Sequence, residues 1–198
     1  TGANDSSFYT DGWLRNVGIG TIPVELYYTP RGKDGLTDSG VLKATTSVEP
    51  GTTLRLADLL GSLFQATGSG QVEVRSNAPS GLTLRTTVEA VTGGDPSLRF
   101  GTEIPTVSFG TGTGVGQGAL ILPGISDDAA NRCNLIVAET TGASATFQTQ
   151  ISNSDGVVLG SRSDTVQPYG QVQIDGIVKA IAGSSVNVTG GYLTVTVT

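Results

Sequence analysis

The residue types that most often do chemistry in proteins are sparse in this chain. It contains no histidine and a single cysteine, Cys133. Catalytic triads that use a histidine base, and zinc sites built from histidine or several cysteines, are therefore excluded. Cys133 stands in a stretch with strand character, so we interpret it as a small buried hydrophobic residue, with a catalytic or cross-linking thiol as the alternative. The sequence assigns no catalytic, cofactor-binding or metal-binding residue.

Paired carboxylates are the acid–base chemistry that remains. Glycoside hydrolysis needs two acids held a few ångströms apart. The strand-borne Glu25, Glu73 and Glu89 fall at polar positions of alternating runs, and such positions usually face solvent. We therefore expect no hydrolase, and no enzyme of another kind. The carboxylates considered are Asp11, Glu25, Glu73, Glu89, Glu103, Asp127 and Asp128.

Three acidic loops could offer oxygen ligands to calcium, which takes carboxylate and carbonyl oxygens. They are residues 33–38, 126–128 and 152–156. None of them follows the EF-hand spacing, so solvated turns are the favoured interpretation and a calcium site is the weaker one. The run GTGTGVGQG at residues 110–118 has glycine at every second position, so it never satisfies G-x-G-x-x-G, and we expect a linker or turn rather than a phosphate loop.

Aromatic residues and glycosylation sequons complete the candidate sites. Exposed aromatics can stack on sugar rings, but Trp13 stands in an alternating strand, so core packing is the favoured interpretation. Tyr27 and Tyr28 are adjacent on a strand and must face opposite sides. Asn4 and Asn187 each begin a three-residue match to the N-glycosylation sequon, which is a weak signal alone.

The bulk properties narrow the class of protein further. The chain has 198 residues, 29 of them glycine, with a net charge of −6 and an isoelectric point near 4.5. Its few basic residues form no cluster, so we expect no nucleic-acid partner. No apolar run approaches the roughly 18 to 20 residues that a membrane span needs. Because the first residue is threonine, we expect a mature secreted protein, with an excised fragment as the alternative.

Two distant parts of the chain repeat one order of residue types, which predicts an internal duplication. In both parts a strand leads to an Asp-Gly turn, then to a proline-preceded alternating run, a short apolar helical segment and a final strand. Thr10 aligns with Cys133 and Val48 with Val166. Asp58 and Asp175 are the predicted N-caps of the two helical segments. The first copy then continues into a strand at 81–91, which has no counterpart in the second copy.

The spacing of short strands predicts an all-β fold. We expect two tandem antiparallel β-sandwich units of Ig-like type, residues 1–105 and 106–198, the second lacking a final strand. The alternative is one larger sandwich or jelly roll. We also expect a strand at 106–109, within a glycine-rich bridge at 91–118.

The first copy carries a resemblance to a known family. The stretches SFYTDGWLRNVGIGTIPVELYYTPRG, VEPGTTLRLADLLGSLF and GQVEVRSNAPSG resemble Ig-like β-sandwich modules repeated in large secreted bacterial surface proteins. The second copy resembles them loosely, since Cys133, Asn134 and Ile136 depart from the pattern. The resemblance implies an extracellular module without enzymatic activity and names no ligand.

These features predict a non-enzymatic structural protein that is secreted or at the cell surface. We expect its copies to form a filament or layer by strand addition, since an unpaired strand edge is a template for another chain. The polar arm at residues 1–7 could reach such a neighbour. The alternative is an adhesion or carbohydrate-binding module of a larger secreted protein, which would bind surface glycans or proteins.

Overall fold

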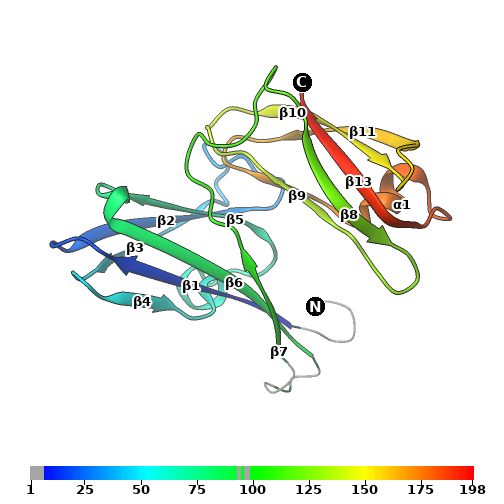
Figure 1. Ribbon diagram of the computed structural model, residues 1–198. Coiled ribbons are helices and arrows are strands. Elements are labelled where there is room, and N and C mark those ends of the chain that lie inside the picture. Colours follow the sequence, from blue (N-terminus) through cyan, green and yellow to red (C-terminus); the bar gives the residue numbers. More distant parts are fainter. Residues whose placement is uncertain (1–6, 93–94, 96–98) are drawn as a thin grey trace. The chain divides into compact units, whose positions relative to one another are not determined.

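The computed structural model describes residues 7–92, 95 and 99–198 (Figure 1). The chain is all-β with antiparallel sheets, as predicted, and it divides into two compact units. Unit 1 comprises Thr1–Tyr28 and Val41–Val107, and unit 2 comprises Thr29–Gly40 and Ser108–Thr198. The segment Thr29–Gly40, which we expected in the first unit, thus belongs to the second.

Unit 1 consists of two sheets around one apolar core. One sheet has the strand order β4-β1-β6-β7 and the other has the order β3-β2-β5. The core takes residues from both sheets because apolar residues alternate along the strands, as at Leu14, Val24 and Leu26. The elements are β1 (Ser7–Asn16), β2 (Ile22–Pro30), β3 (Leu42–Val48), β4 (Thr53–Leu56), the helical turn η2 (Leu59–Leu63), β5 (Gly70–Ser76), the turn η3 (Pro79–Gly81), β6 (Leu82–Val91) and β7 (Arg99–Ile104).

Unit 2 also consists of two sheets around one core. Its larger sheet has the order β11-β10-β13-β8, and β12 pairs with β9 in the smaller one. Phe147 and Ile151 of β10 and Ile177 of the short helix are fully buried at the centre. The elements are β8 (Leu120–Asp127), β9 (Leu135–Ala138), β10 (Ala145–Ser152), β11 (Val158–Val166), β12 (Gln171–Ile174), α1 (Ile177–Ala182) and β13 (Val188–Val197).

The two units pair corresponding strands in the same register. β9 pairs with β12 as β1 pairs with β4, and β10 pairs with β11 as β2 pairs with β3. The residues opposite one another agree with the alignment of Thr10 with Cys133 and of Val48 with Val166. Examples are Gly12–Leu56 with Leu135–Ile174, and Val24–Thr46 with Phe147–Asp164.

The same side-chain contact fixes the start of the helical segment in each unit. The Oδ1 atom of Asp11 accepts a hydrogen bond from the Asp58 N–H at 2.9 Å, and Oδ1 of Asn134 accepts one from the Gly176 N–H at 2.9 Å. Asp58 occupies the predicted N-cap position but makes no side-chain cap bond. The prediction of Asp175 was wrong by one residue, since Gly176 is the N-cap there and its φ of 54° suits glycine.

The bridge between the last strand of unit 1 and the first of unit 2 differs from the prediction. Residues 106–109 form no strand, and β7 ends immediately before Pro105. None of the helices in the described residues has the length and apolar character needed to cross a membrane.

Candidate functional site

The carboxylates considered for catalysis are mostly held by cations. Asp127 and Asp11 are the buried ones, with 1% and 6% of their surface exposed. The Oδ1 atom of Asp127 lies 3.7 Å from the Lys179 ammonium. In the described part of the chain, no group of three histidine, cysteine or acidic residues could hold a metal ion. The ion pairs are Asp11–Arg55, Glu25–Lys43 at 2.6 Å, Glu73–Arg75 at 2.7 Å and Glu103–Arg85 at 3.3 Å.

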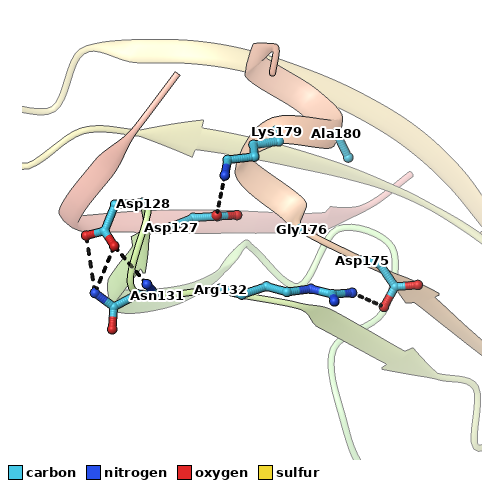
Figure 2. A pocket seen from close by; sticks show the side chains of 8 residues that line it. All are labelled: Asp127, Asp128, Asn131, Arg132, Asp175, Gly176, Lys179 and Ala180. Carbon is cyan, nitrogen blue, oxygen red and sulfur yellow. Dashed lines mark hydrogen bonds and ion pairs between the residues drawn. The ribbon is translucent and has the colours of Figure 1, made fainter. Parts of the chain in front are cut away.

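A shallow pocket on unit 2 gathers several of these charges (Figure 2). Its polar groups are largely occupied by one another. Asp128 accepts hydrogen bonds from the backbone N–H groups of Ala130 and Asn131, both at 2.8 Å. Asp175 binds Arg132 at 3.2 Å. Arginine and lysine thus offset the charges of the aspartates, although the buried Oδ2 atom of Asp127 has no hydrogen-bond partner among the described residues. The lining residues are Asp127, Asp128, Asn131, Arg132, Asp175, Gly176, Lys179 and Ala180.

The other two acidic loops also use their oxygens within the loop. Asp34 accepts from the Leu36 N–H at 2.8 Å, and Asn153 accepts from the Val157 N–H at 2.9 Å. Asp38 binds Lys33 at 3.2 Å. These are side-chain contacts that stabilise turns, which agrees with the favoured interpretation of the loops.

The aromatic residues considered for sugar binding are either buried or have arginine side chains near their rings. Trp13 was expected in the core, but it lies on the face of β1 opposite the buried Leu14 and is half-buried. The guanidinium groups of Arg55 and Arg85 lie 5.8 and 5.9 Å from its ring centroid. Tyr27 and Tyr28 face opposite sides as predicted.

Tyr28 is buried in the core, and the half-buried Tyr27 ring has the Arg75 guanidinium 4.3 Å from its centroid. The sequon residue Asn187 is exposed, whereas Asn4 lies outside the described residues, as do residues 1–6 of the polar arm.

Cys133 lies immediately before β9 and is half-buried. Burial raises the pKa of its thiol, and the negative charge of the nearby Asp127 raises it further. A raised pKa keeps the sulfur protonated at neutral pH, and the thiol is a poor nucleophile. This environment suits the interpretation of Cys133 as a packing residue.

The feature that stands out in unit 2 is the open edge of β9. In unit 1, β1 lies between β4 and β6, whereas β9 pairs with β12 and with no other strand in the described part of the chain. The far edge of β12 is covered by the segment Thr29–Gly40, because Gly32 donates to the Gln171 carbonyl at 2.9 Å. Of the two edges of this sheet, that of β9 is therefore the open one.

The direction of the backbone groups on this edge can be read from their neighbours. Glu139 donates its N–H to the Gly170 carbonyl at 2.9 Å, toward the β12 side. Successive residues of a strand direct their N–H and C=O groups to alternate sides. Ile136 and Ala138 therefore direct theirs to the open edge. Thr140 follows the same alternation, and its carbonyl on the open side accepts from the Gly110 N–H at 3.4 Å.

The core beside this edge is incompletely covered. Leu120 and Leu122 of β8 pair with Val195 and Leu193 of β13, which are buried, so all four side chains face the core. Nevertheless Leu120 is 49% exposed and Leu122 is 41% exposed. Val137 of β9 also faces the core and is only half-buried. An open strand edge and uncovered apolar side chains thus lie along the same side of unit 2.

β9 carries none of the devices that usually protect an edge, whereas β8 carries some of them. β9 reads Leu-Ile-Val-Ala, without a charge, proline or glycine, and β8 has no charged residue before Asp127. Exposed edges in monomeric proteins are commonly blocked by lysine, proline or a bulge. β8 does have Pro123 and a register shift, but β9 has no such feature. The edge of β9 is therefore suited to accept a strand.

Sequence reasoning found part of this site and missed the rest. The absence of a counterpart to residues 81–91 indicated the missing strand. The exposure of Leu120 and Leu122 gave no signal, because their sequence reads as an ordinary buried strand. No family model, curated protein or solved structure matches the chain.

Proposed function

We propose that this chain is a non-enzymatic structural protein of the extracellular space or cell surface. Its copies join into a filament or layer by strand addition at the open edge of β9. The observation that carries the proposal is this edge, which lies beside the half-exposed, core-facing Leu120 and Leu122. A strand added there would pair the free N–H and C=O groups of β9 and cover the apolar residues at the same time.

A further part of the proposal is that the two units arose by internal duplication. The shared ladder registers support it, as do the equivalent contacts of Asp11 and Asn134. Under this relationship unit 1 is the template for unit 2, and β6 marks where the added strand belongs. β6 contributes Leu82 and Leu84 to the core of unit 1, and the added strand supplies the equivalent apolar cover.

The other classes of function have less support. The acidic candidates are engaged with cations or turn backbone, and the chain has no histidine to act as a general base. For an adhesion or carbohydrate-binding module, an open aromatic ring would be the expected platform. Trp13 instead has the Arg55 and Arg85 guanidinium groups over its ring, which leaves no broad face for a sugar.

The experiment that tests assembly is sedimentation velocity of the untagged protein over a wide concentration range, followed by negative-stain electron microscopy. We expect the weight-average mass to rise with concentration and the micrographs to show repeating filaments or sheets, since strand addition between units of different type need not close. A protein that stays monomeric at its highest soluble concentration, with and without calcium, contradicts the proposal.

A further inference from the structure

Unit 1 has an uncovered apolar face of its own, at one end of its larger sheet. Phe8, Ala90 and Phe100 lie opposite one another on β1, β6 and β7. They share the face of the sheet that carries the buried Leu14, because Leu14 is an even number of residues from Phe8 on the same strand. Yet Phe8 is 60% exposed and Phe100 is 68% exposed. Among the residues that the structure describes, none covers the core-facing side of this sheet at β7.

The exposure of Phe100 follows from the difference in width between the two sheets of unit 1, whereas Phe8 is exposed at the end of its strand. The larger sheet continues to β7, while the facing sheet ends at β5 in the described residues. In unit 2 the situation is reversed, since the larger sheet continues past β13 to β8 and the facing sheet ends at β9. In the described part of unit 1, β7 has no strand of the facing sheet opposite it. In unit 2, β8 extends the facing sheet past the point where the sheet of β9 ends.

The directions of the strands allow the two to fit. The outer edge of β7 carries no partner strand in the described part of the chain. β7 runs opposite to β6 and lies on the side of β6 away from β1. Viewed along its own chain direction with the core-facing side up, β7 has its free edge on the same side on which β6 has the edge that pairs with β1. A β7 strand antiparallel to β9 would thus direct its core-facing residues, among them Phe100 and Ile104, to the same side as Val137.

We propose that β7 of one copy is the strand that adds to β9 of a second copy. This inference rests on the proposed function and names the donor. The joined sheet has the order β12-β9 followed by β7-β6-β1-β4 of the neighbour. Phe100 and Ile104 of the neighbour then lie beneath Leu120 and Leu122, two core-facing side chains of unit 2 that are about half exposed. Because β9 has no charged residue, Glu103 of β7 meets no like charge there.

The test is cross-linking between two single-cysteine chains, each built on the Cys133→Ala background. One chain carries Phe100→Cys and the other carries Leu122→Cys, and the mixture is treated with a short bismaleimide. The matched control replaces Phe100→Cys by Ile19→Cys, since Ile19 is fully exposed in a loop of the same unit. Circular dichroism of each variant checks that the fold is retained.

We expect dimers cross-linked between positions 100 and 122 to form several-fold faster than the control dimers. If the copies assemble but this pair does not react faster than the control, the choice of β7 as donor is overturned while assembly stands. If no assembly occurs at any concentration, the proposed function fails as well. A chain carrying both cysteines that cross-links internally at high dilution would overturn the intermolecular contact.

A charge substitution gives a second measurement that does not depend on the cross-linker. Phe100→Asp introduces a carboxylate at an exposed position, so it leaves the core of unit 1 intact. We expect it to abolish assembly in sedimentation velocity, whereas Ile19→Asp leaves assembly unchanged. Equal assembly of the two variants would overturn the inference.

Discussion

Leu14 and Val137 occupy the same position in their units, opposite Leu54 and Val172 in the equivalent ladders, yet only Leu14 is fully buried. Leu84 of β6 lies beside Leu14, and it packs against the core of unit 1. No described strand lies on that side of Val137. Under the proposal of strand addition, a strand added beside β9 would remove this difference in burial.

Truncating these two residues should have unequal effects. Leu14→Ala leaves a cavity in a closed core, so we expect it to cost about 2–5 kcal/mol of the free energy of unfolding of unit 1. Val137→Ala removes a half-exposed side chain and should cost about 1 kcal/mol or less in the unassembled protein. Urea unfolding followed by the fluorescence of Trp13, the one tryptophan, reports unit 1. Far-UV circular dichroism follows both units, so the part of its transition that has no counterpart in the fluorescence reports unit 2. Equal costs would contradict the open core of unit 2.

The Asp11 carboxylate should stabilise unit 1 mainly as a buried hydrogen-bond acceptor. It accepts from the Asp58 N–H and from Arg55, and Asp11 is only 6% exposed. Asp11→Ala leaves the Asp58 N–H without that partner, and we expect a loss of about 1–3 kcal/mol. Asp11→Asn keeps an acceptor, as Asn134 does in unit 2, and should lose less than half as much. Trp13 fluorescence during urea unfolding measures both, and identical losses would contradict this role.

Glu139 should make the stability of unit 2 depend on acid pH. Burial alone would raise the pKa of its carboxyl. Hydrogen bonds to the carboxylate outweigh burial and hold the pKa below its ordinary value; they come from the Thr141 hydroxyl and from the N–H groups of Tyr169, Thr141 and Gly142. A carboxyl whose pKa is lowered by folding stabilises the folded state above its unfolded pKa of about 4.3, and this contribution is lost as the pH falls through the folded pKa.

We therefore expect Glu139→Gln to lower the melting temperature at pH 7. The difference from the unaltered protein should shrink as the pH falls below about 4. Thermal unfolding by far-UV circular dichroism between pH 3 and 7 makes the comparison. A difference that stays constant with pH would contradict the assignment.

The Cys133 thiol should react slowly in the folded protein. Burial and the charge of Asp127 both raise its pKa, so little thiolate is present near neutral pH. We expect modification by a chromogenic disulfide reagent to be several-fold slower than that of a free cysteine at pH 8. Unfolding in urea should restore the ordinary rate. A folded-state rate equal to that of free cysteine would contradict the packing role.

The sequence was sufficient to predict the all-β fold, because its strands alternate strongly between apolar and polar residues. The alignment of Thr10 with Cys133 and of Val48 with Val166 agrees with the equivalent ladder registers of the two units, which supports the duplication hypothesis. The prediction that Trp13 packs in the core was wrong, and the limit of the alternation pattern explains the error. Period-two alternation shows that Trp13 and Leu14 face opposite sides, but it does not say which side is the core.

The candidate site was less accessible to sequence reasoning because it depends on what is absent in three dimensions. Nothing local to Leu120 or Leu122 distinguishes a covered from an uncovered strand. The assignment of Thr29–Gly40 to unit 2 was missed for a similar reason, since its contact with Gln171 joins residues far apart in the chain. Non-local contacts of this kind leave no periodic signal.

The most direct test of strand addition is to remove one hydrogen-bond donor from the open edge of β9. Ala138 is exposed and directs its N–H to that edge, so Ala138→Pro removes the donor and leaves the ladder with β12 intact. Ala138→Val keeps the N–H and is the matched control. Sedimentation velocity of the two variants and the unaltered protein at equal concentration is the measurement. We predict that Ala138→Pro stays monomeric while the other two assemble; equal assembly of all three would contradict strand addition at β9.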